Sequence, residues 1–451
     1  MKLLLLSHTG QTSGGAEKCL IEYTEVLTSL GHTCKIIIPN EGQMTELLKT
    51  KQIPYKVICY GWATEPHRKA KANDVMTSTG SALTKLFHEV EEYNPEVIIT
   101  NTSVIPWGLF AGKAFNIPTV VLVHEILNNK DPSLRMAPSY KDYGAILNEH
   151  TDFVIYNSDF VKGEFKDILT KPKSAKKILY PIPPIDKKII DSYYRKNDIG
   201  DVLKIAIIGA ISPRKNQLEA ASAIKILYDQ GIRDLVLDIY GDQKTDIRYT
   251  QKIKRFIKDN NLQDIVTFKG YTNDVYETLN RYNIVLSVAT YEPFGRTVIE
   301  GQLFGKIVIS NDTGGGLELI QHNKTGLVYR LGKPEELAKN IKWVINNKKQ
   351  AITLGLNAKE EQYVKYISES RYDALSECID YCKSLNKPKE LNLYDPLLDL
   401  FQYNHYLNNK YKNWYRITHN RITYILKKIL SRVKFLTKKL ILRFGYPIFS
   451  K

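Results

Sequence analysis

Two glutamates, Glu292 and Glu300, stand eight positions apart in the segment YEPFGRTVIE. An apolar stretch typical of a buried strand, Asn283–Ala289, precedes them, and Thr297–Phe304 has the pattern of a helix. The pattern therefore predicts a loop at the carboxyl end of a strand, with a carboxylate on each side of a helix N-terminus. A carboxylate in such a place can accept hydrogen bonds from two neighbouring hydroxyl groups.

The helix start itself predicts an anion site. The N–H groups of Thr297 and Val298 should be free and should point toward a ligand, where the helix dipole adds to their effect. Gly295 allows a ligand to approach the backbone closely. A diphosphate between two hydroxyl-binding carboxylates fits a sugar nucleotide. The alternative is that Glu300 is only a first-turn residue favoured by the dipole and Glu292 a solvated loop residue.

Two further loops also follow strand-like runs. In IGAISPRKNQ, Arg214 and Lys215 follow a strand-like run, and two cations beside a diphosphate would stabilise the charge that grows on a leaving nucleotide. In SNDTGGGLELI, from Ser310 to Ile320, a strand, a glycine-rich turn and a helix follow one another again. We expect these loops to face one cleft.

Strand-like runs rich in Ile, Val and Leu alternate with amphipathic stretches along the chain, which predicts parallel sheets covered by helices on both faces. The proline-rich YPIPPIDKK, residues 180–188, divides them into two sets and is a candidate linker. We therefore expect an α/β fold with two doubly wound, Rossmann-like domains facing a cleft. The expected strands are Lys2–Ser7, Lys35–Ile38, Lys56–Cys59, Val97–Thr100, Thr119–Val123 and Phe153–Tyr156, then Lys204–Gly209, Leu235–Tyr240, Ile265–Lys269, Asn283–Ser287 and Ile307–Ser310.

Composition agrees with a globular protein of more than one domain. The chain has 451 residues, of which 43% are hydrophobic and 25% charged. Five scattered cysteines argue against a disulfide framework and fit a reducing compartment. The apolar start is too short for a signal peptide and no run is long enough to span a bilayer, which predicts a cytoplasmic protein.

Five segments in this order resemble the retaining GT-B glycosyltransferases of family 4. They are SGGAEKCLIEYTEVLTSLGH near the start, VHE at Val123–Glu125, GAISPRKNQ, YGD at Tyr240–Asp242, and the paired-glutamate element followed by TGGGLELI. The resemblance covers roughly residues 1–385. It implies an N-terminal acceptor-side domain over residues 1–182 and a nucleotide-sugar domain over 183–385, whose last helix returns to the first domain.

The resemblance assigns roles to two glycines and two cationic residues. Gly14 and Gly15 would form the loop that closes on the donor diphosphate, and Lys215 would be the phosphate-binding lysine. The family often has an arginine directly after the strand's glycine, where this chain has Ala210, so Arg214 would supply the second charge.

The resemblance also assigns the hydroxyl-binding groups, with Glu292 on the donor sugar and Glu300 on the ribose. His124 would lie near the donor sugar; a structural histidine after a buried strand is the alternative. The backbone completes the donor site, through the N–H groups of Phe294, Gly295 and Arg296 beside Glu292 and those of Thr297 and Val298 at the distal phosphate.

The chain contains no Asp-x-Asp, the element with which the other major glycosyltransferase fold holds a divalent metal. We therefore expect no metal cofactor. The resemblance implies transfer of a hexose-type unit with retention, from a nucleotide-diphosphate sugar to a membrane-associated glycan or lipid acceptor, as in bacterial surface polysaccharide assembly. In the family's same-face mechanism the protein supplies position and electrostatics.

The C-terminal extension, residues 386–451, lies outside the resemblance. Residues 401–451 hold 12 of the chain's 64 Lys and Arg and no Asp or Glu, and the chain's net charge is +16. Between Trp414 and Phe444 apolar residues recur at helical spacing with cations beside them, which predicts an amphipathic helix in an anionic membrane surface. A helix docked on the protein or an oligomer interface is the alternative, and the continuous apolar face argues against nucleic acid.

Other functions remain open at this point. A GT-B sugar-nucleotide epimerase or phosphorylase would use the same residues. A Rossmann dehydrogenase would need G-x-G-x-x-G at a helix start, which neither GQTSGG nor TGGG provides. A non-catalytic membrane-binding protein would leave the cleft residues without a role. The sequence does not identify the base, the sugar, the acceptor, the linkage or the oligomeric state.

Overall fold

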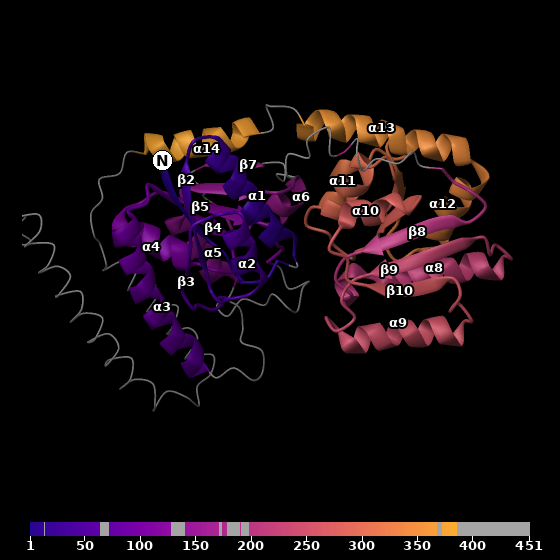
Figure 1. The fold of residues 1–451 in the computed structure, drawn as a ribbon, viewed down its shortest axis with the longest axis horizontal. Coiled ribbons are helices and arrows are strands. Elements are labelled where there is room, and N and C mark those ends of the chain that lie inside the picture. The colour runs from indigo at the N-terminus through magenta and orange to yellow at the C-terminus, as the bar shows by residue number, and fades with distance from the viewer. Residues whose placement is uncertain are drawn as a thin grey trace, which may run out of the picture.

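A computed structural model of the chain has two lobes, each built around a parallel sheet (Figure 1). The structure describes residues 1–12, 14–63, 72–127, 140–170, 174–177, 190, 198–367 and 372–385. The candidate linker 180–188 and the extension 386–451 lie outside these residues, so the predictions made for them are not tested.

The first sheet has seven strands in the order β3-β2-β1-β4-β5-β6-β7, and its paired strands are parallel. Leu5 of the central β1 is in register with Ile36 on one side and Ile99 on the other. Leu3 to Leu6 are fully buried, as expected for a strand covered on both faces. The strands are β1 Lys2–Leu6, β2 Thr33–Ile38, β3 Tyr55–Val57, β4 Val97–Asn101, β5 Thr119–Val123, β6 Phe153–Tyr156 and β7 Ala175–Lys177.

The second sheet has six strands in the order β10-β9-β8-β11-β12-β13, again with parallel pairing. Both sheets have the same topology. The first strand of each is central, the next two strands lie on one side of it, and the later strands lie on the other side. The prediction of two doubly wound domains is confirmed. The strands are β8 Leu203–Ile208, β9 Leu235–Tyr240, β10 Val266–Gly270, β11 Ile284–Ser287, β12 Ile307–Asn311 and β13 Leu327–Tyr329.

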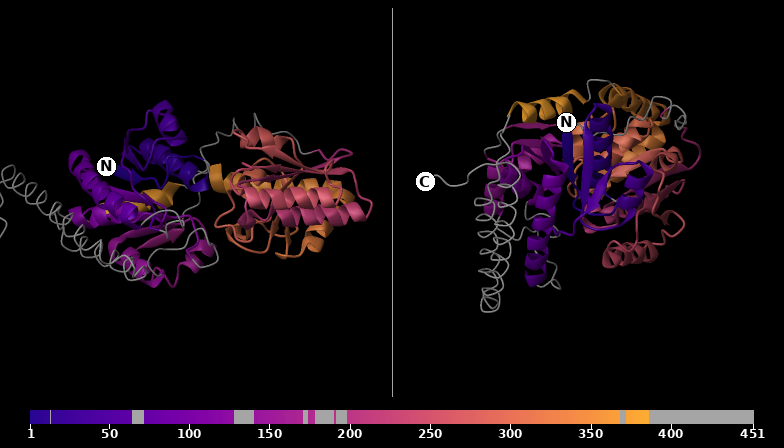
Figure 2. Two further views of the ribbon diagram at one scale, coloured as in Figure 1. Left: turned by 90° about the horizontal axis from the view of Figure 1, so that it is seen from below. Right: turned by 60° about the vertical axis from the view of Figure 1, so that its left-hand side comes forward.

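Helices cover both faces of each sheet (Figure 2). In the first lobe these are α1 Gly15–Ser29, α2 Gln43–Thr50, α3 Ala72–Tyr93, α4 Trp107–Phe115, α5 Tyr140–His150 and α6 Asp159–Glu164. In the second lobe they are η2 Pro213–Lys215, α8 Gln217–Asp229, α9 Ile247–Asp259, α10 Val275–Asn280, α11 Arg296–Leu303, η3 Gly315–Leu319, α12 Pro334–Asn346 and α13 Lys348–Ile367. None of the described helices is long and apolar enough to cross a membrane.

The last described helix, α14 Asp373–Ser384, lies on the first lobe although the chain before it belongs to the second (Figure 1). Its Tyr381 ring lies 5.6 Å from that of Phe153 on β6, and Glu377 pairs with Lys176 on β7. Cys378 and Cys382 are buried on this helix as free thiols, so they act there as small packing residues.

Candidate active site

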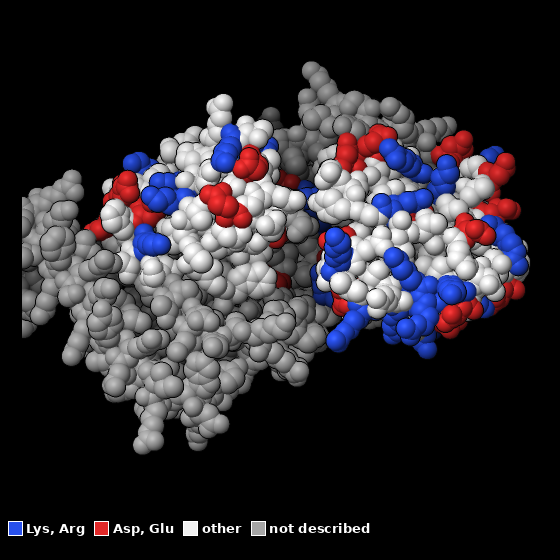
Figure 3. All heavy atoms as spheres, turned by 60° about the horizontal axis from the view of Figure 1, so that its bottom comes forward, with Lys and Arg blue, Asp and Glu red and all other residues white. Residues whose placement is uncertain are grey.

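The predicted site residues gather where the two sheets change winding direction. In the first sheet β1 and β4 are neighbours, and in the second β8 and β11 are. The helices that follow two such strands turn to opposite faces, which leaves a crevice at the strands' carboxyl ends. As spheres, the molecule is hollowed between its two lobes (Figure 3). Loops from both domains therefore meet there.

The predicted cation and carboxylate are in direct contact. Lys215 ends the short η2 helix after β8, and Ser212 accepts a hydrogen bond from its backbone N–H. The Lys215 ammonium forms an ion pair with Oε2 of Glu292, which follows β11. Only 14% of the Glu292 side chain is exposed, so it is not a solvated loop residue.

The surroundings of Glu292 keep its carboxylate charged. Burial by itself raises its pKa, but the charges of Lys215 and Arg214, with a backbone hydrogen bond from Gly295, bring the pKa below its ordinary value. Arg214 also braces the loop, because its Nη1 donates to the Tyr291 carbonyl at 3.4 Å and Thr290 donates to the Arg214 carbonyl at 2.8 Å.

Helix α11 begins at Arg296, one residue before the predicted start at Thr297, and follows Gly295 in the left-handed region with φ of 95°. One detail of the prediction is wrong. The N–H of Val298 is not free for a ligand, because it donates to the Gly295 carbonyl at 2.9 Å in a tight first turn. The positive end of the helix still faces the loop that carries Glu292, and the N–H of Thr297 remains the candidate donor.

The glycine-rich turn after β12 packs directly on this loop. Gly315 donates to the Glu292 carbonyl at 2.7 Å. Gly314 has a φ of 80°, and a Cβ there would lie 2.5 Å from that carbonyl oxygen. Only glycine combines this conformation with so close a backbone approach. The turn therefore determines where Glu292 lies.

Glu300 is in the second turn of α11, with 4% of its side chain exposed. Its Oε1 accepts a hydrogen bond from Nε of Arg296 at 2.8 Å, one helical turn away. The guanidinium of Arg296 binds Glu22 of α1 in the first domain, with Nη1 to Oε2 at 2.8 Å and Nη2 to Oε1 at 2.5 Å. The sequence analysis missed Glu22. Its only sequence signal is a carboxylate on the apolar face of an amphipathic helix.

The first domain contributes a second group of residues. Gly14 is the N-cap of α1 and Gly15 its first residue. A Cβ on Gly14 would lie 2.2 Å from the carboxylate of Glu17, which also approaches His8 with 3.5 Å between Nε2 and Oε1. The helix therefore starts beside the end of β1, where its N-terminus faces the crevice.

His124 follows β5 and is held by Asn101 at the end of β4, with 2.8 Å between Nε2 and Oδ1. The Asn101 amide nitrogen donates to the Ala16 carbonyl at 3.0 Å, which leaves its oxygen to face the histidine. Nε2 of His124 therefore carries the proton and Nδ1 is an acceptor. Burial, with a smaller contribution from His8, lowers the pKa of His124 to about 3, so the ring is neutral at pH 7.

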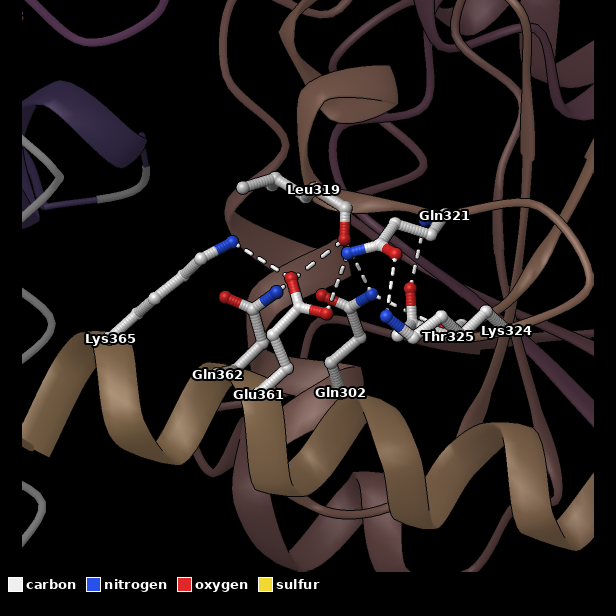
Figure 4. Close-up of polar contacts among 8 residues, drawn as sticks. All are labelled: Gln302, Leu319, Gln321, Lys324, Thr325, Glu361, Gln362 and Lys365. Atoms are coloured by element: carbon white, nitrogen blue, oxygen red, sulfur yellow. Dashed lines mark hydrogen bonds and ion pairs between the residues drawn. The ribbon is translucent and has the colours of Figure 1, made fainter.

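A polar network behind the site fixes α11 relative to η3 (Figure 4). Gln302 is fully buried, and its Nε2 donates to the Leu319 carbonyl at 2.8 Å. Gln362 of α13 reaches the same carbonyl at 3.5 Å, and Gln321 bonds to Glu361 of α13 at 2.9 Å. The two glycine-led helix starts beside Glu292 are thus held as one unit.

A metal site is a separate question. Among the residues that the structure describes, no three His, Cys, Asp or Glu side chains are placed to hold a metal ion. The described cations that act on Glu292 are Lys215 and Arg214.

Family models match both halves of the chain. Residues 13–178 match the model described as Glycosyltransferase Family 4, and residues 191–361 match that of Glycosyl transferases group 1. Together they cover most of the described residues. The chain belongs to the GT-B glycosyltransferases.

Curated relatives of this chain include two glycosyltransferases of Staphylococcus aureus. The poly(ribitol-phosphate) alpha-N-acetylglucosaminyltransferase of Staphylococcus aureus is 31% identical over 133 residues, which are 29% of this chain and 26% of that protein. The capsular polysaccharide biosynthesis glycosyltransferase CapM, also from S. aureus, is 23% identical over 191 residues, 42% of this chain and 49% of CapM. The alignments thus span half or less of each relative.

Solved structures share the fold over most of the chain. Anabaena Alr3699/HepE, solved in complex with UDP and glucose, superposes with a TM-score of 0.70 at 21% identity, over 84% of this GT-B chain and 99% of that one. TarM superposes with a TM-score of 0.66 at 13% identity, over 84% and 98%. These similarities establish the fold.

Proposed function

We propose that this protein transfers a sugar from a nucleoside diphosphate sugar to a glycan or glycolipid acceptor, with retention of the anomeric configuration. The observation that carries the proposal is the contact between Lys215 and Glu292 beside the N-terminus of α11. A cation for phosphate, a carboxylate for sugar hydroxyls and a helix N-terminus meet at one point of the interdomain crevice.

Each group has a role in the proposed reaction. The acceptor oxygen attacks C1 of the donor sugar on the face that the leaving diphosphate departs from, the C1–O bond to phosphate breaks, and the acceptor proton passes to the diphosphate. Lys215 and the N-terminus of α11 stabilise the charge on the leaving group. Glu292, kept ionised, accepts from donor-sugar hydroxyls. The neutral ring of His124 lies near the donor sugar in this proposal, and Glu300 takes the ribose.

Bacterial surface polysaccharide assembly is the proposed setting. It is supported by the activities of the relatives, one acting on poly(ribitol-phosphate) and one in capsular polysaccharide biosynthesis. The basic residues 401–451 would hold the enzyme peripherally on the inner face of the membrane, which brings a lipid-borne acceptor within reach. We also propose that no metal takes part, with Lys215, Arg214 and the N-terminus of α11 as the groups that would stabilise the diphosphate's charge.

A donor screen tests the proposal. Purified protein is incubated with UDP-, GDP- and ADP-sugars, with and without candidate acceptors, and release of nucleoside diphosphate is measured in excess chelator. We expect acceptor-dependent release, and proton NMR of the product should show the donor's anomeric configuration. Sugar phosphate formed with inorganic phosphate would indicate a phosphorylase, and a changed donor sugar without acceptor an epimerase. Abolition by chelator with recovery on adding magnesium would contradict metal independence.

A further inference from the structure

A buried cluster of one arginine and two glutamates joins the domains beside the donor loop, residues 290–295 between β11 and α11. Arg296 makes three hydrogen bonds to carboxylate oxygens, two to Glu22 of α1 and one to Glu300 of its own helix, at 2.5 to 2.8 Å. The exposed fractions of the side chains are 13% for Arg296, 6% for Glu22 and 4% for Glu300. Such a fork of bonds fixes the plane of the guanidinium and the orientation of both carboxylates.

Two carboxylates share one guanidinium in this cluster. Burial raises the pKa of Glu22 to about 7; Arg296 opposes this rise, Glu300 adds to it, and Lys18 lowers it slightly. Tyr276 of α10 also faces the cluster, and burial, with the charge of Glu300, raises the pKa of its hydroxyl. Glu22 is therefore the carboxylate of the cluster whose pKa burial raises.

The donor loop is held by the first domain at its other end as well. Ser158, the N-cap of α6, donates from Oγ to the Pro293 carbonyl at 2.6 Å. Glu318 of η3 accepts from the N–H groups of Asp159 at 3.1 Å and Phe160 at 2.7 Å at the start of α6. The segment from Glu292 to Glu300 thus has a first-domain contact next to each of its two glutamates.

We infer that Arg296 is the positioning residue for recognition of the donor's ribose: it holds Glu300 toward the paired ribose hydroxyls and links this carboxylate, through Glu22, to helix α1 of the first domain. The inference rests on the proposed function, in which Glu300 binds the ribose. It predicts a specific loss when Arg296 is removed: the protein should stop distinguishing ribose from deoxyribose, while phosphate binding at Lys215 persists.

The test compares the affinity of UDP with that of 2′-deoxy-UDP by calorimetry, or GDP and ADP with their deoxy forms if UDP does not bind. The wild type should prefer the ribonucleotide by about tenfold, as expected for hydroxyl bonds to a charged group. Arg296→Met should bring the ratio near one, and Arg296→Lys should restore part of the preference. Glu22→Ala should lower the ratio, since Arg296 then loses its two bonds to Glu22. Arg330→Met, which breaks an exposed pair with Glu336, is the matched control and should change nothing.

Arg296→Met leaves two buried carboxylates without their partner, so the double variant Glu22→Met with Arg296→Met keeps the test valid if the single variant unfolds. Replacing a buried pair by apolar side chains of similar size is often neutral for stability. The ratio of ribonucleotide to deoxyribonucleotide affinity in the double variant should also fall near one, and adding Glu300→Gln should lower this ratio no further. A wild-type ratio retained in the folded Arg296 variants would overturn the inference and leave the proposed function standing. An unchanged ratio in Glu22→Ala would overturn the link to α1. Failure of the wild type to bind any of the diphosphates would overturn both proposals.

Discussion

Lys215→Ala is the most direct test of the site, because the Lys215 ammonium pairs with the Glu292 carboxylate and is the group proposed to bind the phosphate. Its exposed fraction is 19%, so its interactions are partly shielded from water. Loss of one positioned donor to a developing oxyanion costs about 3 kcal/mol. That corresponds to roughly a 150-fold fall in kcat/KM. We expect the fall in initial rates of nucleoside diphosphate release measured over a range of donor concentrations.

The same substitution has a pH signature. With Lys215 gone, burial dominates and the pKa of Glu292 rises. In the wild type the lowered pKa contributes stability that is present above the ordinary Glu pKa, near pH 4.5, and is lost as pH falls through the lower folded value. Wild type and variant should therefore differ most in thermal midpoint near pH 7 and converge in acid, because a protonated Glu292 no longer needs its partner.

Lys225→Ala is the matched control, since Lys225 pairs with Asp229 on the surface of α8. It should leave kcat/KM and the thermal midpoint almost unchanged, as exposed pairs contribute little. If folded Lys215→Ala keeps a kcat/KM within threefold of wild type, Lys215 does not bind the diphosphate and the proposed site is wrong.

Three further predictions concern neighbouring features. Glu292→Gln should lower turnover by about 10- to 100-fold, because hydrogen bonds to a charged group are lost. Glu336→Gln, on the surface, is the control and should leave turnover unchanged. Equal rates in the two variants would refute the role of Glu292. Gly314→Ala should weaken donor binding and lower the thermal midpoint. Gly332 has a similar positive φ, but nothing lies within 4 Å of a Cβ at that position, so Gly332→Ala should lower only the thermal midpoint. If both glycine variants bind donor normally, the turn does not position Glu292. Truncation before Phe401 should abolish sedimentation with anionic liposomes at low salt while activity on a water-soluble acceptor persists, and unfolding of the truncated protein would mean that the tail is a docked structural element.

Much of the fold and part of the site follow from local sequence. The expected strands Thr119–Val123, Phe153–Tyr156 and Leu235–Tyr240 are observed with the same bounds, because continuous apolar runs need a sheet covered on both faces. The strands β7 and β13 were not predicted. Each has three residues and lies at a sheet edge, where the apolar pattern is too short to recognise. The prediction of a free N–H at Val298 was wrong, because this group donates to the Gly295 carbonyl in a tight first turn.

The sequence alone therefore determined the doubly wound domains and the candidate residues at the carboxyl ends of their strands, since the spacing of apolar residues, glycines and charges carries this information locally. Only the tertiary structure decided which charges meet. Lys215 contacts Glu292 across 77 positions, and Arg296 binds Glu22 across 274. Such pairs depend on how loops and whole domains pack, and a buried charge is tolerated only where that packing supplies its partner. The burial that raises the pKa of Glu22 and lowers that of His124 is likewise a property of the assembled domains.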